Sequence, residues 1–188
     1  MKDPPSMKII ESKFENLFTL EPLTFKDERG HFTESYNYEV LRKTGIDIRF
    51  VQDNQSFSKA GVIRGLHFQN APKAQTKLVR VLQGAILDVA VDLRRDKPTF
   101  RMVHAIELSR DNSKQVIIPK GFAHGFSVLS EFAEILYKCD DTYSKEHESG
   151  INIDDPELKI DWKIPLTERI VSAKDKSLPT LKNAKFNF

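Results

Sequence analysis

The sequence predicts an all-β protein folded as a jelly-roll barrel with a few short helices. Short runs that alternate apolar and polar side chains follow one another along most of the chain, and turn signals such as Gln83-Gly84 and Pro119-Lys120-Gly121 separate them. Only residues 37–43 read as a convincing early helix, which Gly45 is placed to cap. Many closely spaced strands with little helix are typical of a β-sandwich or barrel.

The expected strands account for most of the chain up to residue 139. One or two strands are expected over residues 8–23, and a strand that carries His124 follows the turn at 119–121. The other strands are expected over residues 31–35, 48–54, 62–69, 78–82, 85–93, 103–108, 115–118 and 132–139.

Two segments predict specific packing. In residues 85–93 the alternation predicts a core face made of Leu87, Val89, Val91 and Leu93. The opposite face carries Asp88 and Asp92, so it lies against either solvent or a polar interior site. Apolar residues at every second position from 158 to 164 predict a short strand packed across the barrel, with Trp162 as a plug.

Length and composition indicate one soluble domain. We expect a single domain over residues 1–188, with a frayed end at 1–6 and a C-terminal extension at 150–188 packed on the barrel. The 29 basic and 27 acidic residues leave a net charge of +2, which gives no bulk attraction for nucleic acid or an anionic membrane. The single cysteine, Cys139, the lack of a secretory signal and the lack of a run of ~18 apolar residues favour the cytoplasm.

The chain is organised around residues 52–80, which place many polar and charged side chains in core-like strands. Within 64–69, extended backbone sends Arg64, Leu66 and Phe68 to one face and Gly65, His67 and Gln69 to the other. A glycine inside a strand commonly marks a bulge or a close approach to the backbone. A lone histidine is more often structural, but His67 has polar neighbours that suit a site.

Several motifs in this order resemble one enzyme family. They are Val51-Gln52-Asp53-Asn54, Arg64-Gly65-Leu66-His67-Phe68-Gln69, Lys77-Leu78-Val79-Arg80, Pro119-Lys120-Gly121-Phe122-Ala123-His124-Gly125-Phe126, Leu136-Tyr137-Lys138 and Ser172-Ala173-Lys174-Asp175. Together they cover most of the chain and resemble the dTDP-4-dehydrorhamnose 3,5-epimerases. That resemblance implies a metal-free, cupin-like enzyme without a cofactor that inverts two carbons of a nucleotide-linked 4-keto-6-deoxy sugar.

The residues themselves favour proton transfer. Metal-binding cupins often carry a His-x-His pair, but Gln69 stands two residues after His67, and the five histidines lack ligand spacing. Removing a proton beside a ketone requires a base, a donor for the charged oxygen and an acid on the other face. The resemblance implies His67 as the base with Asp175 on its far nitrogen, Lys77 at the enolate oxygen and Tyr137 as the acid.

The resemblance also implies a substrate-binding set. It consists of Arg29, Glu34, Gln52, Asp53, Asn54, Arg64, His124, Tyr143 and Glu148. We expect Arg64 to bind the diphosphate, since guanidinium forks suit phosphate oxygens, and Tyr143 to stack on the thymine. Arg29 and Glu34 match residues that reach the nucleotide, some across a dimer interface, so a homodimer is expected. Asp88 is expected to hold His124.

The expected reaction inverts C3 and C5 of dTDP-4-dehydro-6-deoxy-D-glucose through an enolate, giving dTDP-4-dehydro-L-rhamnose for dTDP-L-rhamnose or related deoxysugar biosynthesis. Two enzymatic alternatives stay open: a single-carbon epimerase and a keto-isomerase on a dTDP-deoxysugar. A non-catalytic sugar-nucleotide binding barrel is a third. A metal-dependent cupin oxygenase is a fourth.

Overall fold

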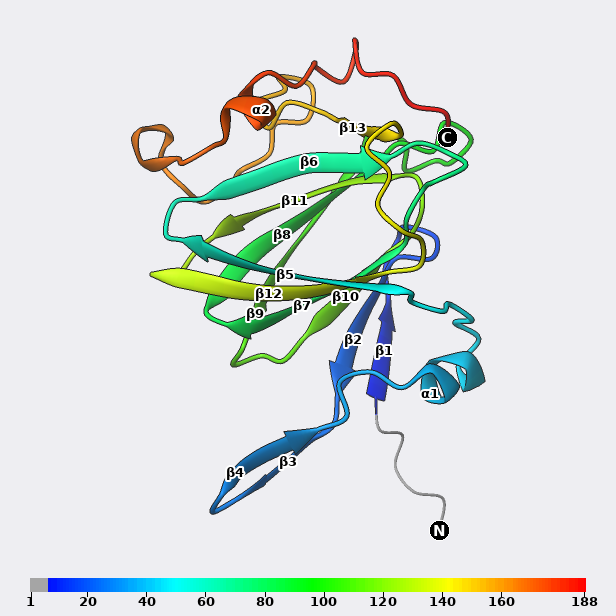
Figure 1. Cartoon of the computed structure of the whole chain (residues 1–188), viewed down its shortest axis with the longest axis vertical. Helices are drawn as coiled ribbons and strands as arrows, with labels where there is room; N and C mark the ends of the chain where they lie inside the picture. Colours follow the sequence, from blue (N-terminus) through cyan, green and yellow to red (C-terminus); the bar gives the residue numbers. More distant parts are fainter. Residues whose placement is uncertain (1–6) are drawn as a thin grey trace.

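The protein is a sandwich of two antiparallel β-sheets. The computed structural model describes residues 7–188, so the expected frayed end at 1–6 lies outside the described part of the chain. The two sheets face each other, and a separate two-stranded hairpin projects from one end of the molecule (Figure 1). The predicted all-β jelly-roll architecture is confirmed.

The strands fall into three sheets. The six-stranded sheet contains, in spatial order, β1 (Met7–Glu11), β2 (Phe18–Pro22), β10 (Gln115–Ile118), β7 (Lys77–Gln83), β12 (Phe132–Cys139) and β5 (Gln52–Lys59). The five-stranded sheet contains β13 (Glu148–Gly150), β6 (Ile63–Gln69), β11 (Phe122–Val128), β8 (Ala85–Asp92) and β9 (Val103–Ser109). The hairpin is formed by β3 (Thr24–Asp27) and β4 (Gly30–Thr33), and the short helices are α1 (Tyr38–Lys43), η1 (Leu166–Glu168) and α2 (Ala173–Lys176).

The main core lies between the two facing sheets. Val79 and Ile135 come from the six-stranded sheet, while Ala90 and Phe126 come from the five-stranded sheet. Burying an aliphatic or aromatic side chain of this size contributes roughly 1.5–3 kcal/mol, so this layer fixes how the two sheets face each other. Any cavity between the sheets therefore has walls that are held from both sides.

Strand β8 is buried on both faces. The predicted core face is buried, but it packs against the C-terminal segment that contains Trp162, on the outer side of the five-stranded sheet. The opposite face, with Ile86 and Ala90, lies in the core between the sheets. Asp88 belongs to that inner face and is fully buried, so of the two alternatives left open for it, the polar interior site is the correct one.

The predicted strand over residues 158–164 is wrong. Lys159 and Lys163 have φ values of 49° and 60°, and these left-handed conformations break the extended backbone. Trp162 is nevertheless fully buried, and its Nε1 donates a hydrogen bond to the carbonyl of Ile153 at 3.0 Å. The indole thus closes the outer side of the five-stranded sheet as the expected plug.

The strand predicted over residues 48–54 lies further along the chain, at Gln52–Lys59. Ile48 and Phe50 pack instead beside α1, where Leu41 is buried against the outer face of the six-stranded sheet. The alternation is a weak signal in residues 55–59, because the inward-facing positions are Ser56 and Ser58 and the apolar Phe57 lies on the exposed outer face of β5.

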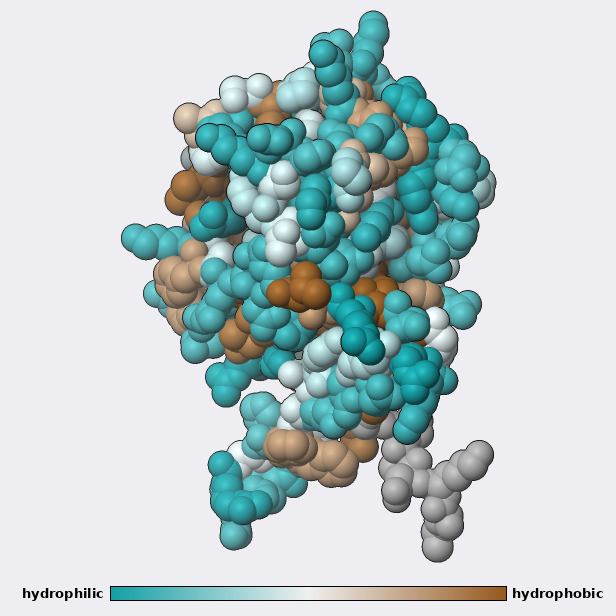
Figure 2. Space-filling model, turned by 45° about the vertical axis from the view of Figure 1, so that its right-hand side comes forward, coloured by the Kyte–Doolittle hydropathy of each residue, from teal (hydrophilic) through white to brown (hydrophobic). Residues whose placement is uncertain are grey.

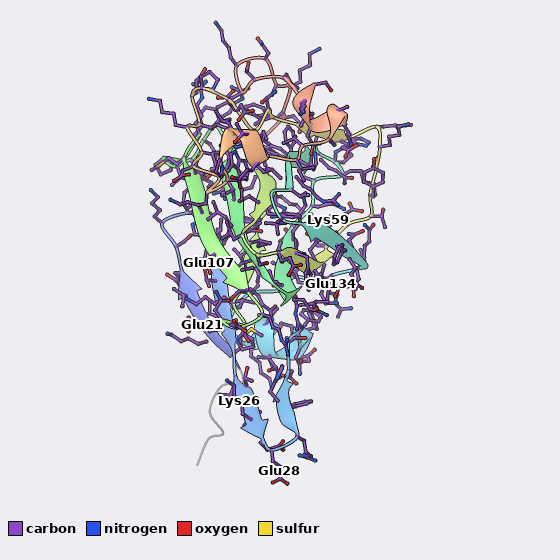
Figure 3. All side chains as sticks on the ribbon, turned by 90° about the vertical axis from the view of Figure 1, so that its left-hand side faces the viewer. Glu21, Lys26, Glu28, Lys59, Glu107 and Glu134 are labelled. Atoms are coloured by element: carbon purple, nitrogen blue, oxygen red, sulfur yellow. The ribbon has the colours of Figure 1, made fainter. Side chains whose placement is uncertain are left out.

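The β3–β4 hairpin extends away from both sheets, with Glu28 at its tip and Lys26 along it (Figure 3). Phe25 and Phe32 are paired across the hairpin and are 59% and 69% exposed. Elsewhere the visible surface is mainly hydrophilic with separate hydrophobic patches (Figure 2). Within residues 7–188, no helix is long and apolar enough to cross a membrane.

Candidate active site

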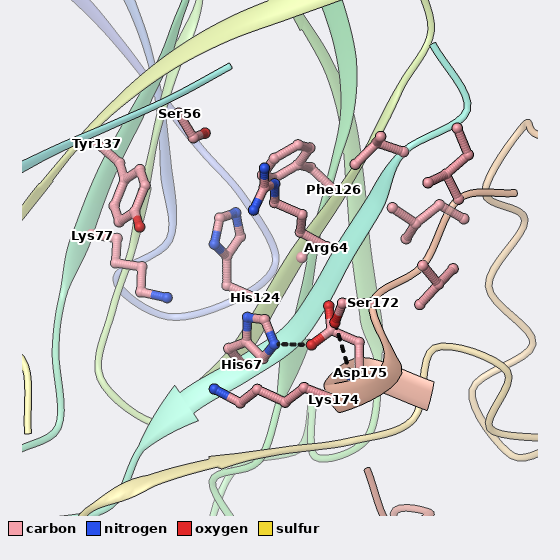
Figure 4. Close-up of a pocket in the computed structure, with 15 residues that line it drawn as sticks. Ser56, Arg64, His67, Lys77, His124, Phe126, Tyr137, Ser172, Lys174 and Asp175 are labelled. Carbon is pink, nitrogen blue, oxygen red and sulfur yellow. Dashed lines mark hydrogen bonds and ion pairs between the residues drawn. The ribbon is translucent and has the colours of Figure 1, made fainter. Parts of the chain in front are cut away.

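A cavity of about 530 Å³ lies between the two sheets. The five-stranded sheet contributes His67 from β6 and His124 from β11, and the six-stranded sheet contributes Lys77 from β7 and Tyr137 from β12. Asp175 approaches from α2, behind His67 (Figure 4). Segments far apart in the sequence therefore bring imidazole, ammonium and phenol groups to one cavity.

A bulge at Gly65 shapes the five-stranded wall. The pairing of β6 with β11 shifts register here, and Gly65 has a φ of +132°. A Cβ at this position would lie 2.6 Å from the Cα of Gly125, so only glycine fits. The bulge interrupts the alternation of β6, and Arg64 lines the cavity together with His67. The prediction that these two side chains lie on opposite faces is therefore wrong.

Asp175 holds the ring of His67. Its Oδ1 lies 2.8 Å from Nε2 of His67, and its Oδ2 accepts a hydrogen bond from the backbone N–H of Gly65 at 3.3 Å. The carboxyl is placed by the start of α2, where Ser172 accepts a hydrogen bond from the N–H of Asp175 at 3.0 Å.

Electrostatics keep this carboxyl ionised. Burial acts to raise the pKa of Asp175, but its hydrogen bond and charge interaction with His67 and its bond from Gly65 outweigh burial, so the pKa lies below its ordinary value. An ionised Asp175 fixes the proton of His67 on Nε2. In the neutral ring, Nδ1 is then the nitrogen that can accept a proton.

His124 forms a second pair of the same kind. It lies directly opposite His67 in the pairing of β11 with β6, and its Nε2 is 2.8 Å from Oδ2 of Asp88. Asp88 is fully buried and His124 is 8% exposed. The expected contact between Asp88 and His124 is confirmed.

Lys77 and Tyr137 lie on neighbouring strands of the opposite wall. Lys77 begins β7 and pairs with Cys139, two residues beyond Tyr137 on β12. Burial lowers the pKa of Lys77, an effect that nearby negative groups oppose. Burial also raises the pKa of Tyr137, so the phenol keeps its proton over a wider pH range. The wall thus offers an ammonium group that gives up its proton more readily than usual and a phenol that keeps its proton.

A smaller cavity of about 160 Å³ adjoins the first and shares His67, Lys77 and Tyr137 with it. Its other polar lining residues are Gln52, Asn54, Gln69, Gln75, Tyr143 and Glu148. The hydroxyl of Tyr143 donates a hydrogen bond to Glu148 at 3.0 Å, and Lys174 donates to both carboxylate oxygens of Glu148 at 2.7 Å. The three groups suited to proton chemistry therefore stand where the two cavities meet.

The model of the family described as dTDP-4-dehydrorhamnose 3,5-epimerase matches residues 11–183 of this chain. The chain belongs to the dTDP-4-dehydrorhamnose 3,5-epimerase family. A dTDP-4-dehydrorhamnose 3,5-epimerase from Pseudomonas aeruginosa is 49% identical over 172 residues, which cover 90% of this chain and 93% of the relative.

Solved structures of the family are equally similar. A dTDP-4-dehydrorhamnose 3,5-epimerase from Bacillus anthracis with TDP and PPi bound is 53% identical, with a TM-score of 0.90 and coverage of 93% of this chain and 99% of that chain. A dTDP-6-deoxy-D-glucose-3,5-epimerase from Legionella pneumophila in complex with dTDP-4-keto-L-rhamnose is 46% identical, with a TM-score of 0.90 and 94% coverage of both chains.

Most residues that the resemblance implied for this epimerase family line the two cavities. The main cavity contains His67, Lys77, Tyr137, Asp175, Arg64 and His124. The smaller one adds Gln52, Asn54, Tyr143 and Glu148.

Three expected binding residues lie outside both cavities of their own chain. Asp53 lies on the outer face of β5, because Gln52 and Asn54 on either side of it point inward, and it pairs with Lys138 at 2.9 Å. Arg29 lies in the exposed turn of the hairpin, paired with Asp27. Glu34 follows β4 and accepts a hydrogen bond from Asn37 at 3.1 Å.

Sequence reasoning missed several lining residues. Ser56 faces the main cavity, and the inward alternation of residues 52 and 54 along β5 is a signal that would have found it. Lys174 also lines that cavity and stands beside Asp175 in a motif already singled out. Phe126 lines the cavity as well, and its position two residues after His124 on the expected strand is a signal that would have found it. In residues 7–188, no group of three or more His, Cys, Asp or Glu side chains is arranged to hold a metal ion.

Proposed function

We propose that this protein is the epimerase that inverts C3 and C5 of dTDP-4-dehydro-6-deoxy-D-glucose, giving dTDP-4-dehydro-L-rhamnose in dTDP-L-rhamnose or related deoxysugar biosynthesis. The observation that carries the proposal is the position of His67 and Tyr137 on opposite sheets, across one cavity that Lys77 also lines. Inversion at carbon requires a base on one face and an acid on the other, and these two walls supply them.

The reaction begins when Nδ1 of His67 removes the proton from the carbon beside the C4 ketone. The electron pair of the broken C–H bond forms a C=C bond to C4 of the sugar. The negative charge that develops on the C4 oxygen is stabilised by the ammonium group of Lys77. Tyr137 then donates its phenolic proton to the opposite face of the same carbon. The product is an isomer of the substrate. Solvent then takes the proton from His67 and returns one to the Tyr137 phenolate, and the steps are repeated at the other carbon.

Asp175 makes His67 an effective base. When the imidazole takes up a proton, its positive charge lies 2.8 Å from the buried carboxylate. The protonated ring is therefore stabilised where it forms, without rearrangement of the site. The same contact holds the ring in one orientation, so the direction of Nδ1 is fixed for both deprotonations.

The nucleotide is the part of the substrate that the surrounding residues bind. Arg64 and Lys174 supply positive charge at the main cavity, which suits a diphosphate. Tyr143 is 55% exposed at the smaller cavity, where its ring is available to stack on a base. The relatives solved with TDP and with dTDP-4-keto-L-rhamnose support a dTDP-linked ligand.

We further propose one epimerase domain over residues 1–188, with 150–188 as its extension, that works as a cytoplasmic homodimer. Arg29 and Glu34 lie on or beside a projecting hairpin with two exposed phenylalanines, and neither lines the cavities of its own chain. In a dimer, this hairpin would bring both residues to the partner's cavity. The free, buried thiol of Cys139 suits a reducing compartment.

Incubation with substrate in deuterated water tests the proposal. The wild-type protein should place deuterium at both C3 and C5 of the inverted product, and His67→Ala should abolish both labels, whereas Glu107→Gln on the exposed face of β9 should not. Label at one carbon would identify a single-carbon epimerase, and a displaced keto group would identify a keto-isomerase. Binding of dTDP with no label at either carbon would identify a binding barrel and overturn the proposal.

A further inference from the structure

A buried polar row lies behind the cavity wall, outside the groups used above. In the five-stranded sheet, His124 on β11 is paired with Ala90 on β8, and Ala90 is paired with His104 on β9. The next row contains Asp88, paired with Phe126 and Ile106. Ala90 has the smallest side chain among these residues, so the space between the two imidazoles is left for the carboxylate of Asp88.

Two atoms in this space have no hydrogen-bond partner in the protein. They are Oδ1 of Asp88 and Nε2 of His104, and both are buried. The other oxygen of Asp88 is already bonded to His124 at 2.8 Å. A buried carboxylate oxygen without a donor is destabilising, so the pair of orphan atoms indicates that something joins them.

The spacing of the strands indicates what joins them. Asp88 and His104 are diagonal neighbours on one face of an antiparallel pair, for which backbone positions are roughly 7–8 Å apart. At this spacing the two side chains face the same space without a direct hydrogen bond between them, and one water can hydrogen-bond to both. The site is polar, since it offers an acceptor on one side and an imidazole nitrogen on the other.

The surroundings of His104 favour the neutral ring. Burial lowers its pKa, which the charge of Asp88 opposes and that of Lys13 reinforces. The ring packs edge-to-face on Phe14, with centroids 5.6 Å apart, which fixes its plane. A neutral ring with its proton on Nε2 can donate to a water, and that water can donate in turn to Oδ1 of Asp88.

We propose that His104 is a positioning residue, joined through one buried water to Asp88 and through Asp88 to His124 in the cavity wall. With donors on both oxygens, the carboxylate of Asp88 has its hydrogen bonds complete. It therefore holds the proton of His124 on Nε2 and keeps the ring in one orientation beside His67. The consequence for catalysis rests on the proposed epimerase function, whereas the water and the tautomer of His124 do not.

The test uses one variant that removes the donor and one that keeps it. His104→Phe preserves a ring against Phe14 but has no polar atom, and His104→Gln retains an amide N–H that can donate. We expect nitrogen NMR to show a single Nε2–H tautomer of His124 in the wild type and in His104→Gln, and a mixture in His104→Phe. We expect kcat to fall about tenfold in His104→Phe, the effect of one charge-assisted hydrogen bond, with KM nearly unchanged.

A high-resolution crystal structure of the wild-type protein provides a check that requires no variant. It should show one water within hydrogen-bond distance of both Oδ1 of Asp88 and Nε2 of His104. Absence of that water, or unchanged His124 signals in a folded His104→Phe protein, would overturn the proposal. Glu107→Gln, on the exposed face of the same strand, serves as the control. If wild-type protein lacks epimerase activity, the NMR and crystallographic results still decide this inference.

Discussion

His67 and His124 lie directly opposite each other on paired strands, and each forms a 2.8 Å hydrogen bond through Nε2 with a buried carboxylate. The two imidazoles differ in access, because the side chain of His67 is 31% exposed and that of His124 is 9% exposed. The more accessible ring is the one suited to contact a substrate carbon. Two similar pairs on one wall can therefore serve as a base and as a fixed part of the pocket.

Replacing Tyr137 by phenylalanine should separate exchange from inversion. The variant retains His67 and Lys77, so it should still take up solvent deuterium at the carbon that loses its proton. Inversion should fall about 100-fold, because the donor for the opposite face is missing. Deuterium content and product configuration, both followed by NMR, measure the two quantities. Tyr143→Phe is the matched control and should keep exchange and inversion coupled, and equal losses in Tyr137→Phe would contradict the assignment.

The alkaline limb of the pH profile should report Lys77. An ammonium group is charged below its pKa, and burial lowers the pKa of Lys77 from 10.5, so its charge is lost at a lower pH than usual. The pKa of Tyr137 is raised, so the phenol loses its proton later. As the pH rises, we expect kcat/KM to fall with a midpoint lower than pH 10.5. In Lys77→Arg, any residual activity should fall at a higher pH than in the wild type. A decline at the same pH in both proteins would rule out Lys77 as its source.

Mixing two inactive variants should reveal whether Arg29 acts across a dimer interface. If Arg29 serves the partner's cavity, a mixed dimer of Arg29→Ala and His67→Ala contains one site with both native residues. Random mixing should then restore about a quarter of the wild-type activity, since half of the dimers are mixed and each has one intact site. If Arg29 served its own chain, or if the protein did not exchange subunits, no activity would return. Refolding the variants together removes the second explanation.

Asp92 should stabilise the fold in a pH-dependent manner. The side chain is fully buried and accepts hydrogen bonds from Arg94 at 2.7 and 2.9 Å and from Thr99 at 2.6 Å. Burial acts to raise its pKa, but these bonds hold it below 3.8. Asp92→Asn should cost about 3 kcal/mol in the free energy of unfolding at pH 7, because it leaves the buried end of Arg94 without its counter-charge.

The sign of the pH effect follows from the lowered pKa of Asp92. Its contribution to stability is fully present above the ordinary pKa of 3.8 and is lost as the pH falls through the lower folded-state value. The difference between the wild type and Asp92→Asn in urea unfolding should therefore shrink as the pH is taken below 3.8. A constant difference from pH 7 to pH 3 would show that packing, not charge, sets the effect.

Alternating hydrophobicity was enough to predict most strands and the architecture, because each strand has at least one face buried in a layer. It failed where tertiary packing sets the backbone. Lys159 and Lys163 adopt left-handed conformations around the buried Trp162, and nothing in two lysines predicts that. The alternation of β6 failed at Gly65, where a glycine signalled a bulge but not which side chains would change face.

Local sequence patterns alone were not enough to predict the site. His67 and Asp175 are 108 positions apart, and no spacing rule links them, so only the family resemblance paired them. The contact between Asp88 and His124 depends on which strands are neighbours in the five-stranded sheet. The orphan atoms of Asp88 and His104 can be seen only when both strands are in place.

The position of His67, Lys77 and Tyr137 where the two cavities meet has a consequence for inhibitor design. Because these three side chains border both cavities, a compound that fills either one contacts them from one side only. A linear molecule that crosses from one cavity to the other would engage all three while placing an aromatic end group against Tyr143.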